Sequence, residues 1–150
     1  MKKFRFQLET LLKVTRMQKD RAEVAFAEVS RRLEEERQQL RQYLEEMQQG
    51  HKDYEDIIAA RRMTVGTLMT YNSFFDWKRR QIEAQQEQII QTRAEQQKKL
   101  RELMEVMNEL KSIEQLKEKR RREYIEEMLA EEQKMLDEIG LNLYMRKDRQ

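Results

Sequence analysis

The sequence predicts an all-α protein in which two long helices fold back on each other as an antiparallel intramolecular coiled-coil hairpin. Three observations support this fold class. Apolar residues recur at alternating steps of three and four along two long stretches, proline is absent, and strong helix formers dominate the composition. Because this spacing places each apolar series on one seam of a helix, a partner helix must remove it from water.

The first helix is expected over about residues 5–62. Eleven of its fifteen seam positions are apolar, although apolar residues make up only 38% of the chain. The periodicity therefore exceeds what composition alone produces. The seam positions are Leu8, Leu12, Thr15, Lys19, Ala22, Phe26, Val29, Leu33, Glu36, Leu40, Tyr43, Met47, Gly50, Tyr54 and Ile57.

The second helix is expected over about residues 67–139, followed by an apolar and basic tail over 140–150. Its seam is mostly polar between Gln85 and Lys99, so we expect the middle of the coiled coil to be held less strongly than its ends. The seam positions are Leu68, Tyr71, Phe75, Lys78, Ile82, Gln85, Ile89, Thr92, Gln96, Lys99, Leu103, Val106, Leu110, Ile113, Lys117, Arg120 and Tyr124.

Glycine and threonine mark the expected ends of the helices. A turn near residues 63–67 is predicted at Gly66, because glycine tolerates positive φ, while Thr64 or Thr67 can cap the next helix. Gly140 is expected to end the second helix as its C′ residue. Gly50 lies inside the first helix, where it should cost about 1 kcal/mol relative to alanine. The whole chain then forms a single elongated domain.

Composition excludes several classes of protein. Lysine and arginine number 31 against 29 acidic residues, so the near balance does not favour a nucleic-acid binder. No cysteine is present, which removes disulfides and thiolate chemistry and is compatible with a reducing cytoplasm. The longest apolar run, Ile57 to Ala60, is too short to cross a bilayer. We therefore expect no transmembrane segment.

The sequence carries no recognisable catalytic or cofactor motif. It has neither a phosphate-binding GxxxxGK[ST] loop nor a GxGxxG turn, an HExxH pair or a serine flanked by glycines. His51 is the single histidine and is interpreted as a solvated surface residue. Runs of glutamate such as Glu34 to Glu36 are typical of a solvated helical face. We expect no enzyme activity, no cofactor and no metal site.

Two apolar groups and one basic run stand out as candidate partner surfaces. Four of the eleven aromatic residues lie within Tyr71 to Trp77, and Phe74 and Trp77 cannot both face the seam with Tyr71 and Phe75. The basic run Lys117 to Arg122 is flanked by glutamates and is better explained as a solvated face than as a phosphate site. Exposed aromatic residues mark protein interfaces, although a small local core under the turn would also explain the cluster.

The second apolar group is expected where a hairpin brings its two termini together. From the start it takes Phe4, Phe6, Leu8, Leu11 and Leu12, and from the finish Met135, Leu136, Ile139, Leu141, Leu143 and Tyr144. Since a two-helix seam can bury only some of these side chains, the rest would form an apolar tip for another protein. Frayed ends are the alternative interpretation.

These features together resemble the FliJ family of flagellar type III export proteins. The resemblance rests on the opening FRFQLETLLKV, the long helix after it, the YNSFF segment just past the turn and the closing MRKDRQ, and it covers essentially the whole chain. It implies an antiparallel two-helix coiled coil, similar to the stalk of rotary ATPases, that binds the export ATPase ring and promotes its assembly and activity. It also implies contact with the export-gate membrane protein, escort of export chaperones, and a cytoplasmic location with peripheral association to the inner membrane at the flagellar base.

The resemblance assigns these contacts to the two ends of the molecule. The ATPase contact is expected at the terminal end and the gate contact at the aromatic cluster, where Phe74 and Tyr71 match the family's gate-binding pattern. One turn later that pattern has an apolar residue where this chain has Lys78, and Trp77 could supply the missing apolar area. The residues concerned are Phe4, Phe6, Leu8, Leu11, Leu12, Leu136, Ile139 and Leu141 for the ATPase, and Tyr71, Phe74, Phe75, Trp77 and Lys78 for the gate.

Other functions stay open at this point. The same fold would serve as the equivalent stalk of a virulence type III secretion system, and neighbouring genes would separate the two. A generic structural coiled coil that pairs between chains is a second alternative, and it predicts a mass above 18.6 kDa in solution. A nucleic-acid-binding coil using Lys117 to Arg122 is a third, and it predicts binding that falls steeply with salt.

Overall fold

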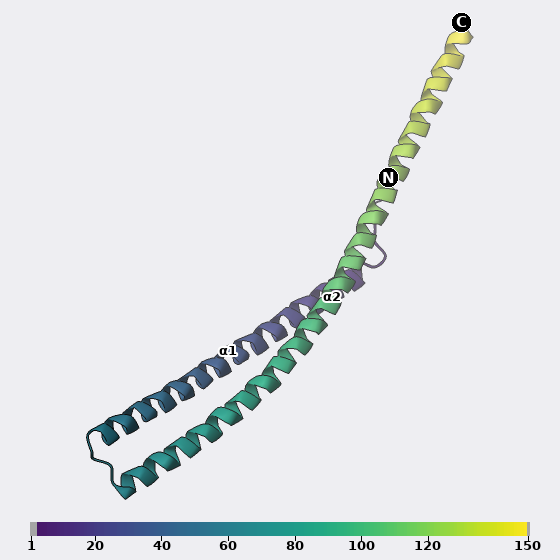
Figure 1. Ribbon diagram of the computed structural model, residues 1–150. Coiled ribbons are helices and arrows are strands. Elements are labelled where there is room, and N and C mark those ends of the chain that lie inside the picture. Colours follow the sequence, from purple (N-terminus) through teal and green to yellow (C-terminus); the bar gives the residue numbers. More distant parts are fainter. Residues whose placement is uncertain (1–2, 150) are drawn as a thin grey trace. The chain divides into compact units, whose positions relative to one another are not determined.

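The computed structural model describes residues 3–149, which form two helices, α1 (Glu9–Ala59) and α2 (Val65–Asp148). The helices run antiparallel and pack against each other, which confirms the predicted all-α hairpin (Figure 1). Contacts divide the chain into two units. We call residues 20–104 the hairpin unit, and residues 3–19 with 105–149 the terminal unit.

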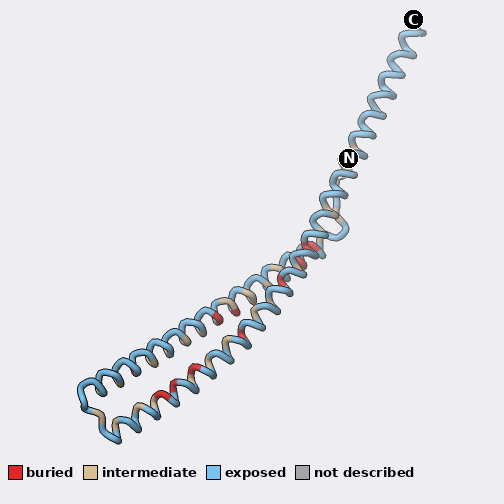
Figure 2. The backbone as a smooth tube through the Cα atoms, in the orientation of Figure 1, coloured by how far each residue is buried: buried red, intermediate tan, exposed pale blue. Residues whose placement is uncertain are grey.

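The heptad seam is where the sequence predicts it in the hairpin unit. Val29 and Leu33 of α1 are buried, as are Phe75, Ile82 and Leu103 of α2. All the other α1 seam positions from Ala22 to Ile57 are buried or half-buried, and the buried positions lie on the facing sides of the two helices (Figure 2). Mutual burial of these two stripes is the main force that pairs the helices.

The polar middle of the seam is bonded across the helices. Gln85 Nε2 donates to the carbonyl oxygen of Glu36 at 2.8 Å, and Gln96 Nε2 donates to Ser30 Oγ at 3.0 Å. Thr92 is fully buried, yet its Oγ1 has no hydrogen-bond partner among the described residues. That the middle of the coiled coil is held less strongly than its ends stays a prediction, because the paired amides stabilise these layers whereas the unpaired hydroxyl does not.

The reversal uses a different residue from the one predicted. Arg62 N donates to Ile57 O at 3.1 Å and Arg61 N to Ile58 O at 3.0 Å, which is the Schellman pattern at the end of a helix. Arg61 occupies its left-handed position with φ of 55°. Gly66 was the wrong choice, because it lies in the first turn of α2 and no glycine of the described chain has positive φ.

Thr64 caps α2 as expected. Its Oγ1 accepts a hydrogen bond from the backbone N–H of Thr67 at 3.1 Å and lies 2.8 Å from Thr67 Oγ1. This arrangement satisfies one of the amides that a helix start leaves without an intrahelical acceptor. The loop over residues 60–64 is therefore closed by a backbone motif on one side and a side-chain cap on the other.

The terminal unit pairs the start of α1 with α2 beyond residue 105. Leu12 and Leu110 are buried there. Lys117 Nζ forms an ion pair with Glu9 Oε2 at 2.9 Å, and Arg16 with Glu114 at 3.6 Å. The hydrogen bond from Lys117 lowers the pKa of Glu9 below its ordinary value, against a smaller opposing effect of desolvation.

The second helix is longer than predicted at its carboxyl end. We expected a C′ residue at Gly140, but α2 continues through it to Asp148. Nothing lies within 4 Å of a Cβ placed at Gly140, and the residues that follow are mostly good helix formers. Since a single internal glycine costs only about 1 kcal/mol, it does not force a stop here. The predicted tail over 140–150 is helical as far as Asp148.

No helix in the described part of the chain is long and apolar enough to cross a membrane.

Candidate partner-binding sites

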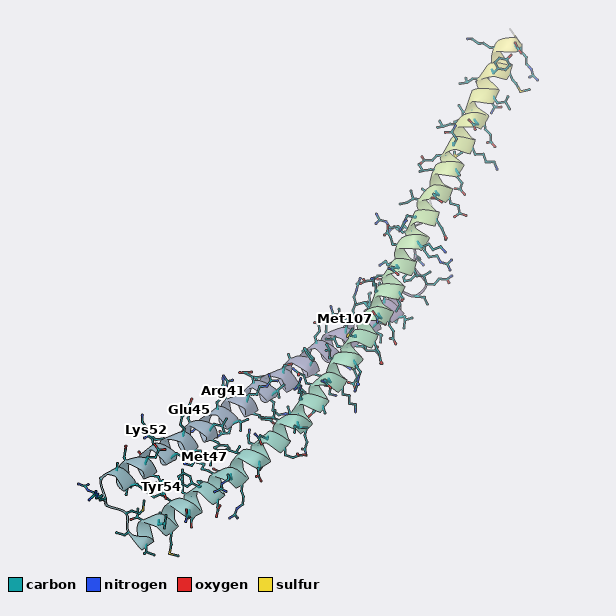
Figure 3. All side chains as sticks on the ribbon, in the orientation of Figure 1. Arg41, Glu45, Met47, Lys52, Tyr54 and Met107 are labelled. Carbon is teal, nitrogen blue, oxygen red and sulfur yellow. The ribbon has the colours of Figure 1, made fainter. Side chains whose placement is uncertain are left out.

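The aromatic site comprises Tyr71, Phe74, Phe75, Trp77 and Lys78, all on the first turns of α2. Phe75 is buried in the seam, where its ring centroid lies 6.0 Å from that of Tyr54 on α1. Tyr54 also meets Tyr71 edge-on at 5.5 Å. Figure 3 shows Tyr54 on the side of α1 that faces α2, whereas Arg41, Glu45 and Lys52 project from the other side. The sequence prediction that Tyr71 and Phe75 face the seam is confirmed.

His51 completes the stack from the α1 side. Its ring lies parallel to that of Phe75, with centroids 4.2 Å apart. The residue is exposed, as expected, but it also covers one face of a core ring. His51 is thus a packing residue at the edge of the aromatic site.

Gly50 creates the space in which Phe74 lies. A Cβ placed at Gly50 would come within 2.5 Å of Phe74 Cε1, closer than real Cβ contacts allow. The absence of a side chain on α1 therefore lets the Phe74 ring lie directly on the backbone of the opposite helix. This explains a glycine inside a long helix, which from the sequence was only an energetic cost.

Lys78 is turned inward rather than presented to solvent. Although it occupies a position where the family pattern has an apolar residue, only 3% of it is exposed. Its ammonium group forms an ion pair with Glu46 and lies 4.8 Å from the ring centroid of Trp77 and 4.9 Å from that of Tyr43. The hydrogen bond from Lys78 lowers the pKa of the Glu46 carboxyl below its ordinary value.

These residues surround a groove of about 540 Å³ at the side of the hairpin. Trp77 forms one wall and is 53% exposed, while Phe74 and Gly50 contribute others. Acidic and amide groups of α1 edge the groove. A concave surface lined by aromatic rings with a few polar groups is the form that side chains of a binding partner fill.

A second groove lies in the terminal unit, where residues 3–8 form the N-terminal segment. The Phe4 ring packs at a tilt of 44° against Tyr124 with centroids 5.6 Å apart, and Phe6 O accepts a hydrogen bond from Glu9 N at 3.1 Å as α1 begins. The segment and α2 enclose about 800 Å³, with Met128 and Met135 among the lining residues. Helix 1 therefore starts later than the predicted residue 5, because these residues lie across α2 instead.

The N-terminal groove does not contain both halves of the predicted ATPase-binding set. Phe4, Phe6 and Leu8 line the N-terminal groove with residues of α2 from Leu116 to Met135, whereas Leu136, the next residue of α2, is not part of that lining. Leu136, Ile139 and Leu141 are all more than half exposed. These three residues lie outside the lining of the N-terminal groove, and their place in one apolar tip with the N-terminal segment stays a prediction.

Two further predicted residues occupy different environments. Leu12 is fully buried, with 0% of its surface exposed, so it belongs to the core of the terminal unit. Leu11, next to it, is 47% exposed and can contact a partner.

The basic run Lys117 to Arg122 is partly neutralised on its own helix, because Glu118 pairs with Arg121 and Arg122 at 3.9 and 3.8 Å. This pairing supports the reading of a solvated helical face.

Three residues of the aromatic site were missed by sequence reasoning. Gly50, Glu46 and Tyr43 lie on α1, more than twenty residues before the cluster. Gly50 and Tyr43 were recognised as seam positions, but only the observed loop over residues 60–64 places Gly50 opposite Phe74, because the predicted turn near residue 65 would place it opposite Arg80. Glu46 carried no such signal, because a glutamate beside a seam position is ordinary in a coiled coil.

Comparison with known proteins assigns the family. The model of the family described as "Flagellar FliJ protein" matches residues 4–149. The chain belongs to the FliJ family. None of the curated protein sequences matches it. Among solved structures, one described as a YscO homolog, CT670, from Chlamydia trachomatis is similar over 99% of both chains, with 22% identity and a TM-score of 0.71. At that identity the likeness shows a shared fold. Family membership together with this fold supports a type III export protein.

Proposed function

We propose that this FliJ-family chain is a stalk-like coiled coil that binds the flagellar export ATPase ring, promotes its assembly and activity, and contacts the export gate. The observation that carries the proposal is the presence of two separate apolar surfaces on one coiled coil of this family. The aromatic groove belongs to the hairpin unit, and the exposed apolar end of α2 belongs to the terminal unit.

The ATPase contact is proposed at the terminal unit. Leu136, Ile139 and Leu141 present apolar side chains that are more than half exposed, and Leu8 of the N-terminal segment and Leu11 of α1 add partly exposed leucines. Phe4 and Phe6 bind within the N-terminal groove and shape this surface. Leu12 is not part of the proposed ATPase-binding surface, because it is buried.

The gate contact is proposed at the aromatic groove. Trp77 is the exposed ring, and Phe74 and Tyr71 line the hollow beside it. Because Lys78 is paired with Glu46 inside the site, its charge does not repel an apolar partner group. Trp77 supplies the apolar area that the family pattern expects one turn after Phe74. Phe75 supports the site from the core.

The remaining family properties complete the proposal. The chain is expected in the cytoplasm, peripherally associated with the inner membrane at the flagellar base, where it escorts export chaperones. The alternative is an equivalent stalk of a virulence type III system, which the fold shared with a YscO homolog also fits. Loss of flagellin secretion on deletion of the gene supports the flagellar role, and unchanged flagellin secretion contradicts it.

A direct test uses the purified chain and the flagellar export ATPase from the same cell. We expect binding and a rise in ATP turnover, both reduced by Leu8→Asp or Leu136→Asp, since a charge at an apolar contact opposes association. Val24→Asp is the matched control, because Val24 is an exposed apolar residue of the hairpin unit outside both surfaces. Absence of binding, or equal loss in all three variants, contradicts the proposed ATPase contact.

The gate contact needs its own measurement against the cytoplasmic domain of the export-gate protein. Trp77→Ala is expected to weaken binding by roughly thirtyfold, the effect of removing a central aromatic anchor. Ile90→Ala, at a similarly exposed position of α2 outside the groove, should leave the affinity unchanged. Equal affinity of wild type and Trp77→Ala contradicts this placement.

A further inference from the structure

The end of α2 carries a second heptad stripe that the terminal unit does not use. From Ile125 the steps of four and three continue through Leu129, Glu132, Leu136, Ile139 and Leu143. All five apolar members are exposed, and every residue from Leu129 to Arg149 is exposed (Figure 2). A helix with such a stripe is incomplete as a coiled coil, since its seam has no facing helix.

The apolar members of this stripe lie outside the lining of the N-terminal groove, although Glu132 of the stripe contributes to that lining. The N-terminal groove is lined by Tyr124, Met128 and Met135 of α2. Ile125, Leu129, Leu136, Ile139 and Leu143 are absent from that lining. At 100° per residue these five side chains fall within an arc of about 80°, beside the covered face. The N-terminal segment therefore leaves the five apolar members of the stripe exposed.

The charges on this stretch indicate what covers the stripe. Residues 123–138 contain seven acidic side chains and one basic side chain, Lys134, whereas residues 146–149 contain three basic and one acidic. A parallel pair of these segments would place the acidic block against itself. An antiparallel pair places the start of the acidic block of each copy, at Glu126 and Glu127, along the basic end of the other, which favours association.

We propose that residues 125–148 of two copies of this chain pair as an antiparallel coiled coil. In the register that sets Leu136 against Ile139 of the second copy, Glu126 comes opposite Lys147. These two residues flank the same edge of the stripe, as a pairing between copies requires.

The pairing is reversible because the stripe is imperfect. Glu132 occupies a seam position, and a charged residue in the seam weakens a coiled coil while it selects the partner and register. The consequence rests on the proposed function: Leu136 and Ile139 are covered by a second copy when no ATPase is bound, and the ring displaces that copy. The dimer is thus a storage form that masks the apolar end of the chain.

Sedimentation equilibrium of the full chain alone tests the pairing. The mass should rise from 18.6 kDa toward twice that value as the concentration increases. Leu136→Asp should raise the dissociation constant about a hundredfold, since each dimer loses two central leucines. Met145→Asp is the matched control, because Met145 is equally exposed on the opposite face of the helix. A monomer at every concentration, or equal weakening by both variants, overturns the proposal.

Cross-linking distinguishes antiparallel from parallel pairing. Because the chain has no native cysteine, only the introduced cysteines can react. Glu126→Cys and Lys147→Cys chains should cross-link with a short bis-maleimide when mixed, and neither should cross-link with itself. Self-cross-linking of each variant would indicate parallel pairing and overturn the antiparallel arrangement. Circular dichroism of each variant checks that the helices are retained. Since no ATPase is present, failure here leaves the ATPase contact to its own test.

Discussion

The seam of the hairpin unit and the stripe at the end of α2 have the same heptad spacing but different surroundings. In the hairpin unit, Leu33 and Val29 are buried against the facing helix. At the end of α2, Leu136 and Leu143 remain exposed. The comparison teaches that heptad spacing shows that a helix needs a partner, but does not show whether the partner lies in the same chain. Predictions about stability and predictions about binding therefore belong to different parts of the molecule.

The most direct test of this difference is to truncate one leucine in the hairpin seam and one at the end of α2. Leu33→Ala should lower the free energy of unfolding by about 2–5 kcal/mol, because Leu33 is 2% exposed and its removal leaves a cavity. Trp77, the single tryptophan, lies in the hairpin unit and reports its unfolding by fluorescence in urea.

The same truncation at the end of α2 is the control. Leu136→Ala should change the free energy of unfolding by no more than about 0.5 kcal/mol, as substitutions at other exposed sites do. The change is measured by Trp77 fluorescence in urea. The measurement is made at low protein concentration, so that pairing between copies does not contribute. A large loss from Leu136→Ala would show that the end of α2 is held by the chain itself.

The glycines provide a second contrast. Gly50→Ala should destabilise the hairpin unit by about 1–3 kcal/mol, since the new methyl group displaces the Phe74 ring. Gly140→Ala meets nothing within 4 Å and should raise helicity, with a gain of about 0.5–1 kcal/mol from propensity. Opposite signs in thermal melts followed by circular dichroism are expected. A stabilising Gly50→Ala would show that Phe74 moves aside without loss.

Much of the fold was predictable because coiled-coil packing is local and periodic. Every α1 seam position from Leu12 to Ile57 is buried or half-buried, and the aromatic pair Tyr71 and Phe75 faces the seam as expected. The end of α2 was mispredicted because Gly140 resembles a helix stop, and glycine is only a weak one. At the reversal, Arg61 adopts the left-handed conformation that was predicted for Gly66 because glycine tolerates positive φ.

The candidate sites were less predictable, since they depend on contacts between distant residues. Phe74 and Trp77 were recognised as surplus aromatic residues, but the groove beside them requires Gly50 from the other helix. The burial of Lys78 follows from its pairing with Glu46, which no periodicity indicates. The chain reversal sets which residues face one another, so an error of a few residues in its position moves every such pair.

Thr92 offers a smaller effect at the polar middle of the seam. Its hydroxyl is buried and has no partner among the described residues, so Thr92→Val should stabilise the protein by about 1 kcal/mol. Thr15 is the control, because it is equally buried but its Oγ1 donates to Leu11 O at 2.8 Å. Thr15→Val should give no gain in a urea titration followed by circular dichroism. Equal gains would mean that side-chain shape, rather than the unpaired hydroxyl, decides the result.

The smallest expected effect concerns the two interhelical ion pairs with a lowered pKa. Glu46 and Glu9 are held below their ordinary pKa of 4.5 by hydrogen bonds from Lys78 and Lys117. Since the folded pKa is the lower one, each pair stabilises fully above pH 4.5, and the contribution is lost as pH falls through the folded pKa. Glu46→Gln and Glu9→Gln should each abolish that part of the acid dependence in urea titrations between pH 7 and 3. The loss at neutral pH should be larger for Glu46→Gln, because Lys78 is buried and Lys117 is only half-buried. An equal or larger loss from Glu9→Gln would show that the surroundings of Lys78, including the rings of Trp77 and Tyr43, stabilise its charge without the carboxylate.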